Sequence, residues 1–281
     1  MIHAAKDLLG CSIAATDGDI GQVEDLLFDD DRWTIRYLVV DTGGWFSGRR
    51  VLISPYAITG ADQAHRRLPS SVTREQVRSS PDIDTQQPVS RQHERSLLGH
   101  YGYPTYWEGG GLWGQALSPQ LLLPGAEGFG SPAAARDQAQ VAHAQQAAQE
   151  SRGDPHLRSC AHVQGYHIEA QDGDIGHVHG FLVDDRSWAI RYLIVDTSNW
   201  WMGRKVVVAP SWISAIRWED RKVAVDLARE RIREAPAYDP DALLQRAQEE
   251  EIFRHYGRQA YWPAEEARER ARDEAERSGR A

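Results

Sequence analysis

Residues 17–58 read DGDIGQVEDLLFDDDRWTIRYLVVDTGGWFSGRRVLISPYAI, and this stretch decides the fold. Residues 172–213 repeat it as DGDIGHVHGFLVDDRSWAIRYLIVDTSNWWMGRKVVVAPSWI. The offset is 155 residues without a gap, and 23 of the 42 aligned residues are identical. Self-similarity at a fixed spacing predicts two related domains rather than one. Positions that both stretches share are candidates for building the fold, and positions that differ are candidates for function.

Alternation of apolar and polar residues predicts short β-strands. The clearest strand runs over 34–41, where Ile35, Tyr37 and Val39 share one face, as a period of two requires. The other strands are predicted over residues 11–15, 20–28, 49–54, 56–61 and 66–72, with Asp-rich turns between several of them. Six short strands joined by turns favour a small barrel or sandwich.

A helical segment follows each set of strands. Thr73 is the expected cap of a helix over 73–79, and a second helix over 89–100 leads into HYGYPTYW. In the second half, Asp239-Pro240-Asp241 is expected to begin a helix that runs to residue 253, and HYGRQAYW follows it. The repeated unit is therefore a set of strands, a helical appendage and an aromatic tail.

These patterns divide the chain into four parts. Residues 1–107, here called the first repeat, and residues 160–263, the second repeat, each carry the full unit. Between them, residues 108–159 form a linker that is rich first in Gly and Pro and then in Ala and Gln. Residues 264–281 are mostly Ala, Glu and Arg, which predicts a charged helix or a disordered tail.

Composition excludes several classes of protein. The net charge is −9 and both halves are acidic, so the basic surface that nucleic acid binding requires is absent from the sequence. No apolar run reaches the roughly 18 residues of a transmembrane segment. Cys11 and Cys160 do not align in the repeat, which fits neither a disulfide framework nor a zinc site. This cysteine usage favours a cytoplasmic location.

The shared motifs, D-G-D-I-G-x-V, W-x-I-R-Y-L-x-V-D-T, G-R-x-V and the H-Y-G…Y-W tail, resemble the PRC-barrel family. That family includes the cytoplasmic domain of the H subunit of photosynthetic reaction centres and the C-terminal domain of a ribosome-maturation factor. With its helical tails, the chain resembles stand-alone bacterial relatives of the H subunit. The resemblance implies a mainly β fold, with one small, roughly six-stranded barrel in each repeat and short helices after it. It also implies a role in protein–protein contact, without a cofactor.

Acidic turns are the first candidate site. They contain Asp17, Asp19, Asp29 and Asp30, with counterparts Asp172, Asp174, Asp184 and Asp185. Hard cations need several oxygen ligands that converge on one point, and this spacing matches no calcium loop. Asp in a turn binds its own backbone, so the turns explain these residues without a metal.

Histidines of the second repeat are the second candidate. His177 and His179 share one face of a predicted strand, and His167 lies on the strand before. Three imidazoles suit a transition metal, so these residues form the predicted metal site. Exposed or hydrogen-bonded histidines are the alternative. The matching residues of the first repeat are Gln22, Glu24 and Ser12.

Two aromatic loops are the best interaction candidates, because aromatic rings beside an arginine are typical of binding hot spots. The predicted interface residues are Trp45, Phe46 and Arg49 in the first repeat and Trp200, Trp201 and Arg204 in the second. The alternative is that a ring folds back over the end of the strands.

Further side chains are expected to stabilise the fold. Arg36 and Asp41, like Arg191 and Asp196, lie on opposite faces of one strand, so each is expected to pair with a neighbouring strand. Trp107 and Trp262 are expected to pack the tail helix of each repeat onto its barrel.

The sequence contains no catalytic motif, neither a nucleophile elbow, a dinucleotide loop nor a metalloprotease signature. We therefore expect a non-enzymatic adaptor for assembly or regulation, with a protein partner. The two repeats are expected to pair as an intramolecular pseudo-dimer, or the chain as a homodimer. One alternative is an accessory on the cytoplasmic side of a photosynthetic or redox membrane complex. The other is a metal-binding protein that uses the three histidines.

Overall fold

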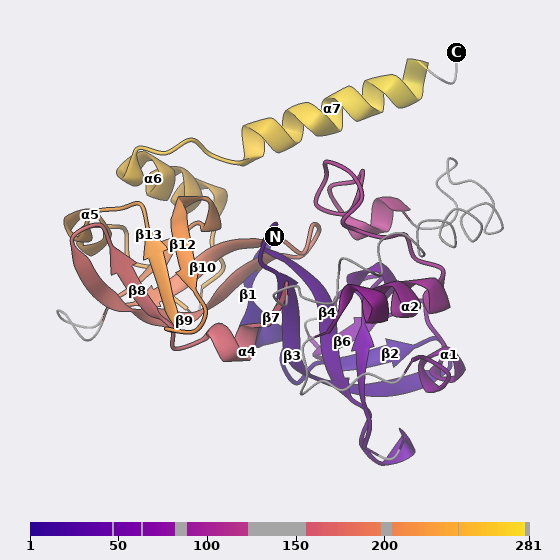
Figure 1. The fold of residues 1–281 in the computed structure, drawn as a ribbon. Coiled ribbons are helices and arrows are strands. Elements are labelled where there is room, and N and C mark those ends of the chain that lie inside the picture. The colour runs from indigo at the N-terminus through magenta and orange to yellow at the C-terminus, as the bar shows by residue number, and fades with distance from the viewer. Residues whose placement is uncertain are drawn as a thin grey trace. The chain divides into compact units, whose positions relative to one another are not determined.

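The structure is a computed structural model that describes residues 1–46, 48–62, 64–81, 89–122, 156–197, 204–240 and 242–278 (Figure 1). Within these residues, strands form two sheets and short helices flank them. The mainly β fold class predicted from the sequence is therefore confirmed.

The first sheet has the strand order β5-β4-β3-β2-β6. Its strands are β2 (Ser12–Ala15), β3 (Gly18–Asp29), β4 (Thr34–Asp41), β5 (Arg50–Ile53) and β6 (Arg67–Pro69). Neighbours are antiparallel except β2 and β6, which run parallel. Five of the six predicted strands are thus confirmed. The strand expected over 56–61 is wrong: Ser54 caps a 3-10 turn, η3 (Pro55–Ala57), because Pro55 cannot donate to a ladder.

The second sheet has the strand order β11-β10-β9-β8-β13-β12. Its strands are β8 (His167–Ala170), β9 (Gly173–Asp184), β10 (Ile190–Asp196), β11 (Lys205–Val208), β12 (Ile213–Arg217) and β13 (Lys222–Val225). The bounds of β3 and β9 differ by 155 residues at both ends, which is the offset of the sequence repeat. Neither strand order closes on itself among the described residues, so closure into two barrels stays a prediction.

Capping residues set the helix bounds. Thr73 and Gln76 form a capping box at the start of α1 (Arg74–Arg78), as the sequence predicts. The helices α2 (Arg91–Tyr101) and α6 (Arg246–Tyr256) end on left-handed Gly102 and Gly257. The start predicted at 239–241 is wrong, because the capping residue of α6 is Gln245. The remaining helices and turns are η1 (Ala5–Leu8), η2 (Gly43–Phe46), η4 (Pro119–Leu122), α4 (Cys160–Val163), η6 (Pro210–Trp212), α5 (Arg229–Arg233) and α7 (Trp262–Ser278).

Two short strands cross between the repeats. Strand β1 (Ile2–Ala4) pairs with β9 of the second repeat, with Ile2 opposite Asp184. Strand β7 (Leu157–Ser159) pairs with β3 of the first repeat, with Leu157 opposite Asp29. Both pairs of partners are related by the same 155-residue offset, so the exchange is reciprocal. Residues 157–159 fall in the predicted linker, and neither of these two strands is among those that the sequence predicts.

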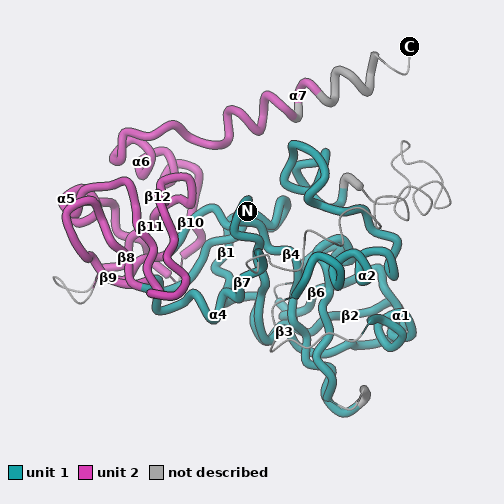
Figure 2. The backbone as a smooth tube through the Cα atoms, in the orientation of Figure 1, with its two compact units in different colours: residues 1–166, 178–193 teal, residues 167–177, 194–281 magenta. Residues whose placement is uncertain are grey.

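The chain forms two compact units (Figure 2). Unit 1 contains residues 1–166 and 178–193, and unit 2 contains residues 167–177 and 194–281. Part of the second repeat therefore belongs to the same unit as the whole first repeat. The division into residues 1–107, 108–159, 160–263 and 264–281 stays a prediction.

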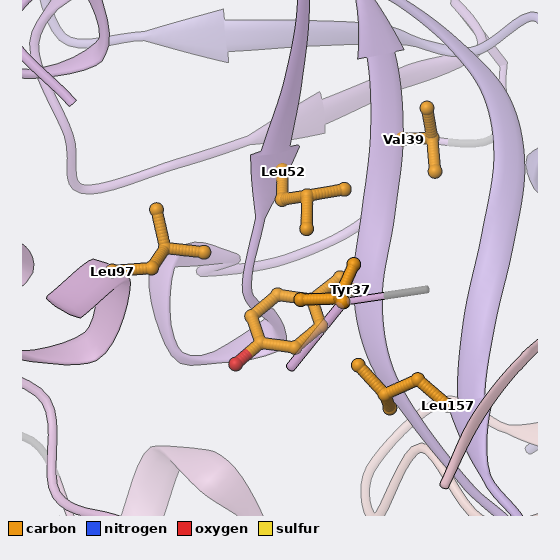
Figure 3. Close-up of a cluster of buried hydrophobic side chains, with 6 residues drawn as sticks. Tyr37, Val39, Leu52, Leu97 and Leu157 are labelled. Atoms are coloured by element: carbon orange, nitrogen blue, oxygen red, sulfur yellow. The ribbon is translucent and has the colours of Figure 1, made fainter. Parts of the chain in front are cut away.

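One apolar cluster of unit 1 is drawn in Figure 3. Its members come from β4, β5, α2, the segment before α2 and β7: Tyr37, Val39, Leu52, Val89, Leu97 and Leu157. Leu157 thus lies in the core of the first repeat although it directly precedes the second. In unit 2, Trp212 contacts Phe253 and Tyr256 of α6, with ring centroids 5.3 and 4.7 Å away.

The cysteines and the helices bear on what composition predicts. Cys11 and Cys160 are both buried and free. Of the helices within the described ranges, none has both the length and the apolar character to cross a membrane.

Candidate functional site

The shared Asp-Gly turn caps a helix in each unit. Asp17 Oδ1 accepts a hydrogen bond from the backbone N of Arg74, the first residue of α1, over 2.7 Å. Asp172 Oδ1 accepts from Arg229, the first residue of α5, over 2.8 Å. A carboxylate at a helix N-terminus also favours the helix electrostatically. These two acidic residues therefore serve the fold.

The second glycine of the D-G-D-I-G motif lies where two strands approach closely. A Cβ atom built on Gly21 would lie 1.9 Å from the carbonyl oxygen of Asp41. The same atom on Gly176 would lie 2.0 Å from that of Asp196. No side chain fits at such distances, so both repeats require glycine here.

The predicted ion pair of Arg36 is present, and its partner is on β3. Arg36 is fully buried, and its Nε donates to Asp29 Oδ2 over 2.7 Å. The guanidinium lies 3.9 Å from the ring centroid of Tyr106 and 4.7 Å from that of Trp113. Trp113 Nε1 in turn donates to the carbonyl oxygen of Ser187 over 2.7 Å. This arrangement neutralises and covers a charge that is costly to bury alone.

The matching pair in the second repeat is Arg191 with Asp184. Arg191 Nη2 donates to Asp184 Oδ2 over 2.9 Å. Burial raises the pKa of Asp184, but Arg191, the backbone N–H of Arg186 and the hydroxyl of Ser187 together outweigh it and lower the pKa below its ordinary value. Asp184 is thus held in its charged form at neutral pH.

A buried carboxylate joins three segments of unit 1. Glu94 of α2 is fully buried and accepts from the hydroxyl of Tyr37 over 3.2 Å and from that of Tyr106. Arg91 Nη1 lies 3.4 Å from the carboxylate, and His156 Nε2 also contacts it. Burial first, and the Glu94 charge second, raise the pKa of both tyrosines. The phenols therefore stay neutral donors, and the carboxylate is fully engaged.

No local sequence pattern signals this cluster, because its members come from separate parts of the chain. The one available signal is that Glu94 and Tyr106 recur as Glu249 and Tyr261 in the second repeat. There, Tyr261 donates to Glu249 over 2.8 Å. The recurrence assigns the pair to the shared fold rather than to a site of one repeat.

The loop between β4 and β5 is closed at its base, and its glycines are exposed. Thr42 Oγ1 donates to the carbonyl oxygen of Arg49 over 2.7 Å, and Gly48 N donates to Gly43 O over 2.7 Å. Gly43 and Gly48 both have positive φ, 57° and 65°, which favours glycine. In the second repeat, Thr197 Oγ1 donates to the carbonyl oxygen of Arg204 over 2.9 Å. Both loops thus begin and end at the same anchored pair.

The arginines predicted for the interface bind within the chain. Arg49 Nη2 donates to the carbonyl oxygens of Ser80 and Pro81, over 3.1 and 2.9 Å. Arg204 contacts the carbonyl oxygens of Arg233 and Ala235 in the same manner. Their guanidinium groups tie the loop base to the segment after the first short helix. The side chains of Trp45 and Phe46, and Trp200 and Trp201 entirely, lie outside the described residues, so their interface role stays a prediction.

Two of the three predicted metal ligands are neighbours. His167 of β8 and His177 of β9 are register partners. In the described ranges of the chain, no three His, Cys, Asp or Glu side chains are arranged to hold a metal ion. The three-histidine site with His179 stays a prediction.

The aromatic tails pack onto the helices that precede them. Trp107 stacks on Arg91 of α2 at 4.4 Å, and Trp262 stacks on Arg246 of α6 at 4.2 Å. His100 Nε2 also bonds the carbonyl oxygen of Gln76 over 2.8 Å, which ties α2 to α1. That Trp107 and Trp262 hold the tail helices on the strands stays a prediction.

Comparison with known proteins gives one domain family and one relative. Residues 2–68 match the PRC-barrel domain family. A protein of Deinococcus radiodurans, described only as an uncharacterized protein, is 32% identical over 103 residues. That match covers 35% of this chain and 37% of the relative, so most of both proteins lies outside it. The residues that match the PRC-barrel domain all lie within the first repeat.

Proposed function

We propose that the chain is a non-enzymatic adaptor in which two PRC-type barrels present matching loops to a protein partner. The match of residues 2–68 to the PRC-barrel domain supports this class for the first repeat. The 23 identical positions between residues 17–58 and 172–213 extend it to the second. A cytoplasmic location is part of the proposal.

One observation carries the proposal: several polar side chains that both repeats share make their contacts within the chain. In the first repeat, Asp17 caps a helix, Asp29 pairs with Arg36, Tyr37 binds Glu94 and Arg49 ties the loop base. Groups engaged in this way are poorly placed for acid–base or nucleophilic chemistry. The shared residues therefore support the fold, and function is left to the surface of the chain.

The loops between β4 and β5, and between β10 and β11, are the part of that surface with binding chemistry. Each carries two adjacent aromatic residues, and the base of each is fixed by the same Thr–Arg hydrogen bond. A fixed loop base lowers the entropy cost of binding, and large rings supply contact area. Two such loops in one chain would also raise the overall strength of binding through multivalency.

Affinity capture from native cells, with mass spectrometry, tests this function. The bait is the full chain, compared with a variant that carries Trp45→Ala, Phe46→Ala, Trp200→Ala and Trp201→Ala. We expect the wild type to recover a protein partner that this variant loses at least about tenfold. His65→Ala is the matched control, because the His65 side chain is 78% exposed and lies outside the loops. Equal recovery by the loop variant and the control contradicts the proposal.

The two alternatives from the sequence make distinct predictions. As an accessory of a photosynthetic or redox membrane complex, the chain would recover an integral membrane protein in the same capture. As a metal protein, it would carry metal after purification without a histidine tag, and His177→Ala would lose it.

A further inference from the structure

Strands β1 and β7 each complete the sheet of the other repeat. Residue 2 lies opposite residue 184 on β9, and residue 157 lies opposite residue 29 on β3. Reciprocal use of one surface is the hallmark of an isologous interface, which normally joins two identical subunits. Here the two participants belong to one chain.

Backbone hydrogen bonds show the same reciprocity. Ile35 N donates to Trp188 O over 2.8 Å, and Ile190 N donates to Trp33 O over 2.7 Å. Thr34 and Ala189 form an antiparallel bridge between these bonds. Trp33 and Trp188 both have positive φ, 49° and 59°, a conformation that bulky residues rarely adopt. Both repeats therefore hold a strained residue at the same point of this junction.

Apolar burial adds to the junction. Leu157 is 7% exposed and belongs to the core cluster of Tyr37 and Leu97 (Figure 3). Ile2, its counterpart on β1, is 8% exposed. Phe28 of the first repeat lies 5.8 Å, between ring centroids, from Phe181 of the second. Removing either strand would expose these groups to water.

A side-chain pair at matching positions accompanies the register of each strand. Arg158 Nε of β7 lies 2.8 Å from Asp30 Oδ2, and both side chains are mostly buried. His3 Nε2 of β1 lies 3.2 Å from Asp185 Oδ2, at the matching position. Ser159 Oγ also donates to Asp25. The junction is thus specific as well as apolar.

From these observations we infer that the chain is an intramolecular dimer, locked by exchanged strands, and that the partner each strand surface fits is the other repeat. The covalent connection between the repeats then adds only a high local concentration of one repeat around the other. Cutting the connection leaves the repeats bound to each other. This inference is independent of the adaptor function, since an external partner is not involved.

The test uses the full chain with a protease site in place of residues 133–139. After folding and cleavage, light scattering coupled to size exclusion measures the mass. We expect both fragments to elute together at the mass of the uncut chain at micromolar concentration. Two separate species of about half that mass would overturn the inference.

Charge reversal assigns the association to the exchanged strand. Arg158→Asp is expected to weaken the association of the cleaved fragments at least about tenfold, because it leaves Asp30 facing a like charge. Adding Asp30→Arg to it is expected to restore the association. Arg78→Asp is the matched control, because Arg78 pairs with Glu75 on the exposed face of α1. If Arg158→Asp behaves as this control does, the strand does not hold the repeats together and the inference fails.

Circular dichroism of each uncut variant provides a second measurement. An uncut Arg158→Asp chain with the wild-type spectrum shows that the substitution leaves the chain folded, so that separation of its cleaved fragments reports a weaker junction. Loss of the spectrum that Asp30→Arg does not recover would contradict the ion pair as the element that fixes the register.

Discussion

The first and second repeats share their internal contacts but differ in what covers them. Arg36 and Arg191 both pair with an aspartate on the neighbouring long strand, yet Arg36 is fully buried and Arg191 is 9% exposed. After the aromatic tail of the first repeat, the chain turns back and places Trp113 over Arg36. After the tail of the second, it continues as α7, with Arg268 at the matching position. Residues shared by the two repeats thus set the local fold. The segment after each aromatic tail sets how far the buried arginine is exposed.

The exchanged strands show the same contrast in their charges. Arg158 on β7 carries its charge at every physiological pH and pairs with Asp30. His3 on β1 pairs with Asp185 at the matching position. The two ends of one reciprocal junction therefore use different side chains, although their backbone registers are the same.

The largest expected effect comes from the covering segment. Trp113→Ala is expected to lower the free energy of unfolding by about 3–5 kcal/mol, because it empties a fully buried site and uncovers Arg36. Arg268→Ala, at the same position of the second repeat, is expected to change it by less than about 0.5 kcal/mol, since Arg268 is exposed. Urea unfolding followed by circular dichroism measures both. Equal losses would erase the contrast between the repeats.

The shared glycine should behave alike in both repeats. Gly21→Ala and Gly176→Ala are each expected to cost about 3 kcal/mol, because the new methyl group would overlap a backbone carbonyl. Gly60→Ala is the control, as a Cβ there meets no atom within 4 Å. Thermal unfolding reports the three variants. A Gly21→Ala protein as stable as Gly60→Ala would refute the close approach of β3 and β4.

The exchanged strands should contribute comparably at their apolar positions. Leu157→Ala is expected to cost about 2–3 kcal/mol, since it leaves a cavity beside Tyr37. Ile2→Ala is expected to cost a similar amount, because its burial matches that of Leu157. Guanidinium unfolding compares the two variants. A loss of stability in only one of the two variants would show that the two exchanged strands contribute unequally to the free energy of unfolding.

The smallest expected effects concern acid. The pKa of Asp184 is lowered in the folded chain, so the stability it contributes is present above the unfolded value of about 3.9 and is lost as pH falls through the folded value. Burial raises the pKa of Asp30, although Arg158 lowers it in part. The contribution of Asp30 to the free energy of unfolding therefore increases as the pH falls. Asp184→Asn should therefore flatten the acid loss of stability between about pH 5 and pH 2, and Asp30→Asn should steepen it.

Urea titrations at several pH values measure these slopes. Slopes that change in the same direction in both variants would contradict the opposite pKa shifts.

Local sequence signals predict much of the fold. Alternation over 34–41 and the cap at Thr73 correspond to β4 and α1 because each depends on neighbours in the sequence. The exchanged strands are not predicted, because three residues are too few to show the alternation of apolar and polar residues that marks a strand. Ile2–Ala4 also shares no identical residue with Leu157–Ser159. The Glu94 cluster is not predicted, because its burial and its partners depend on tertiary structure. Glu94 and His156, for example, are 62 residues apart in the sequence.

The most direct test of the reciprocal junction is a disulfide between the register partners Leu27 and Ser159. Leu27→Cys and Ser159→Cys are combined with Cys11→Ser and Cys160→Ala, and the protease site replaces residues 133–139. Partners across an antiparallel pair lie within disulfide range. After oxidation and cleavage, a denaturing non-reducing gel should show one band at full mass, which reductant splits in two. Two bands before reduction would contradict the exchange of strands.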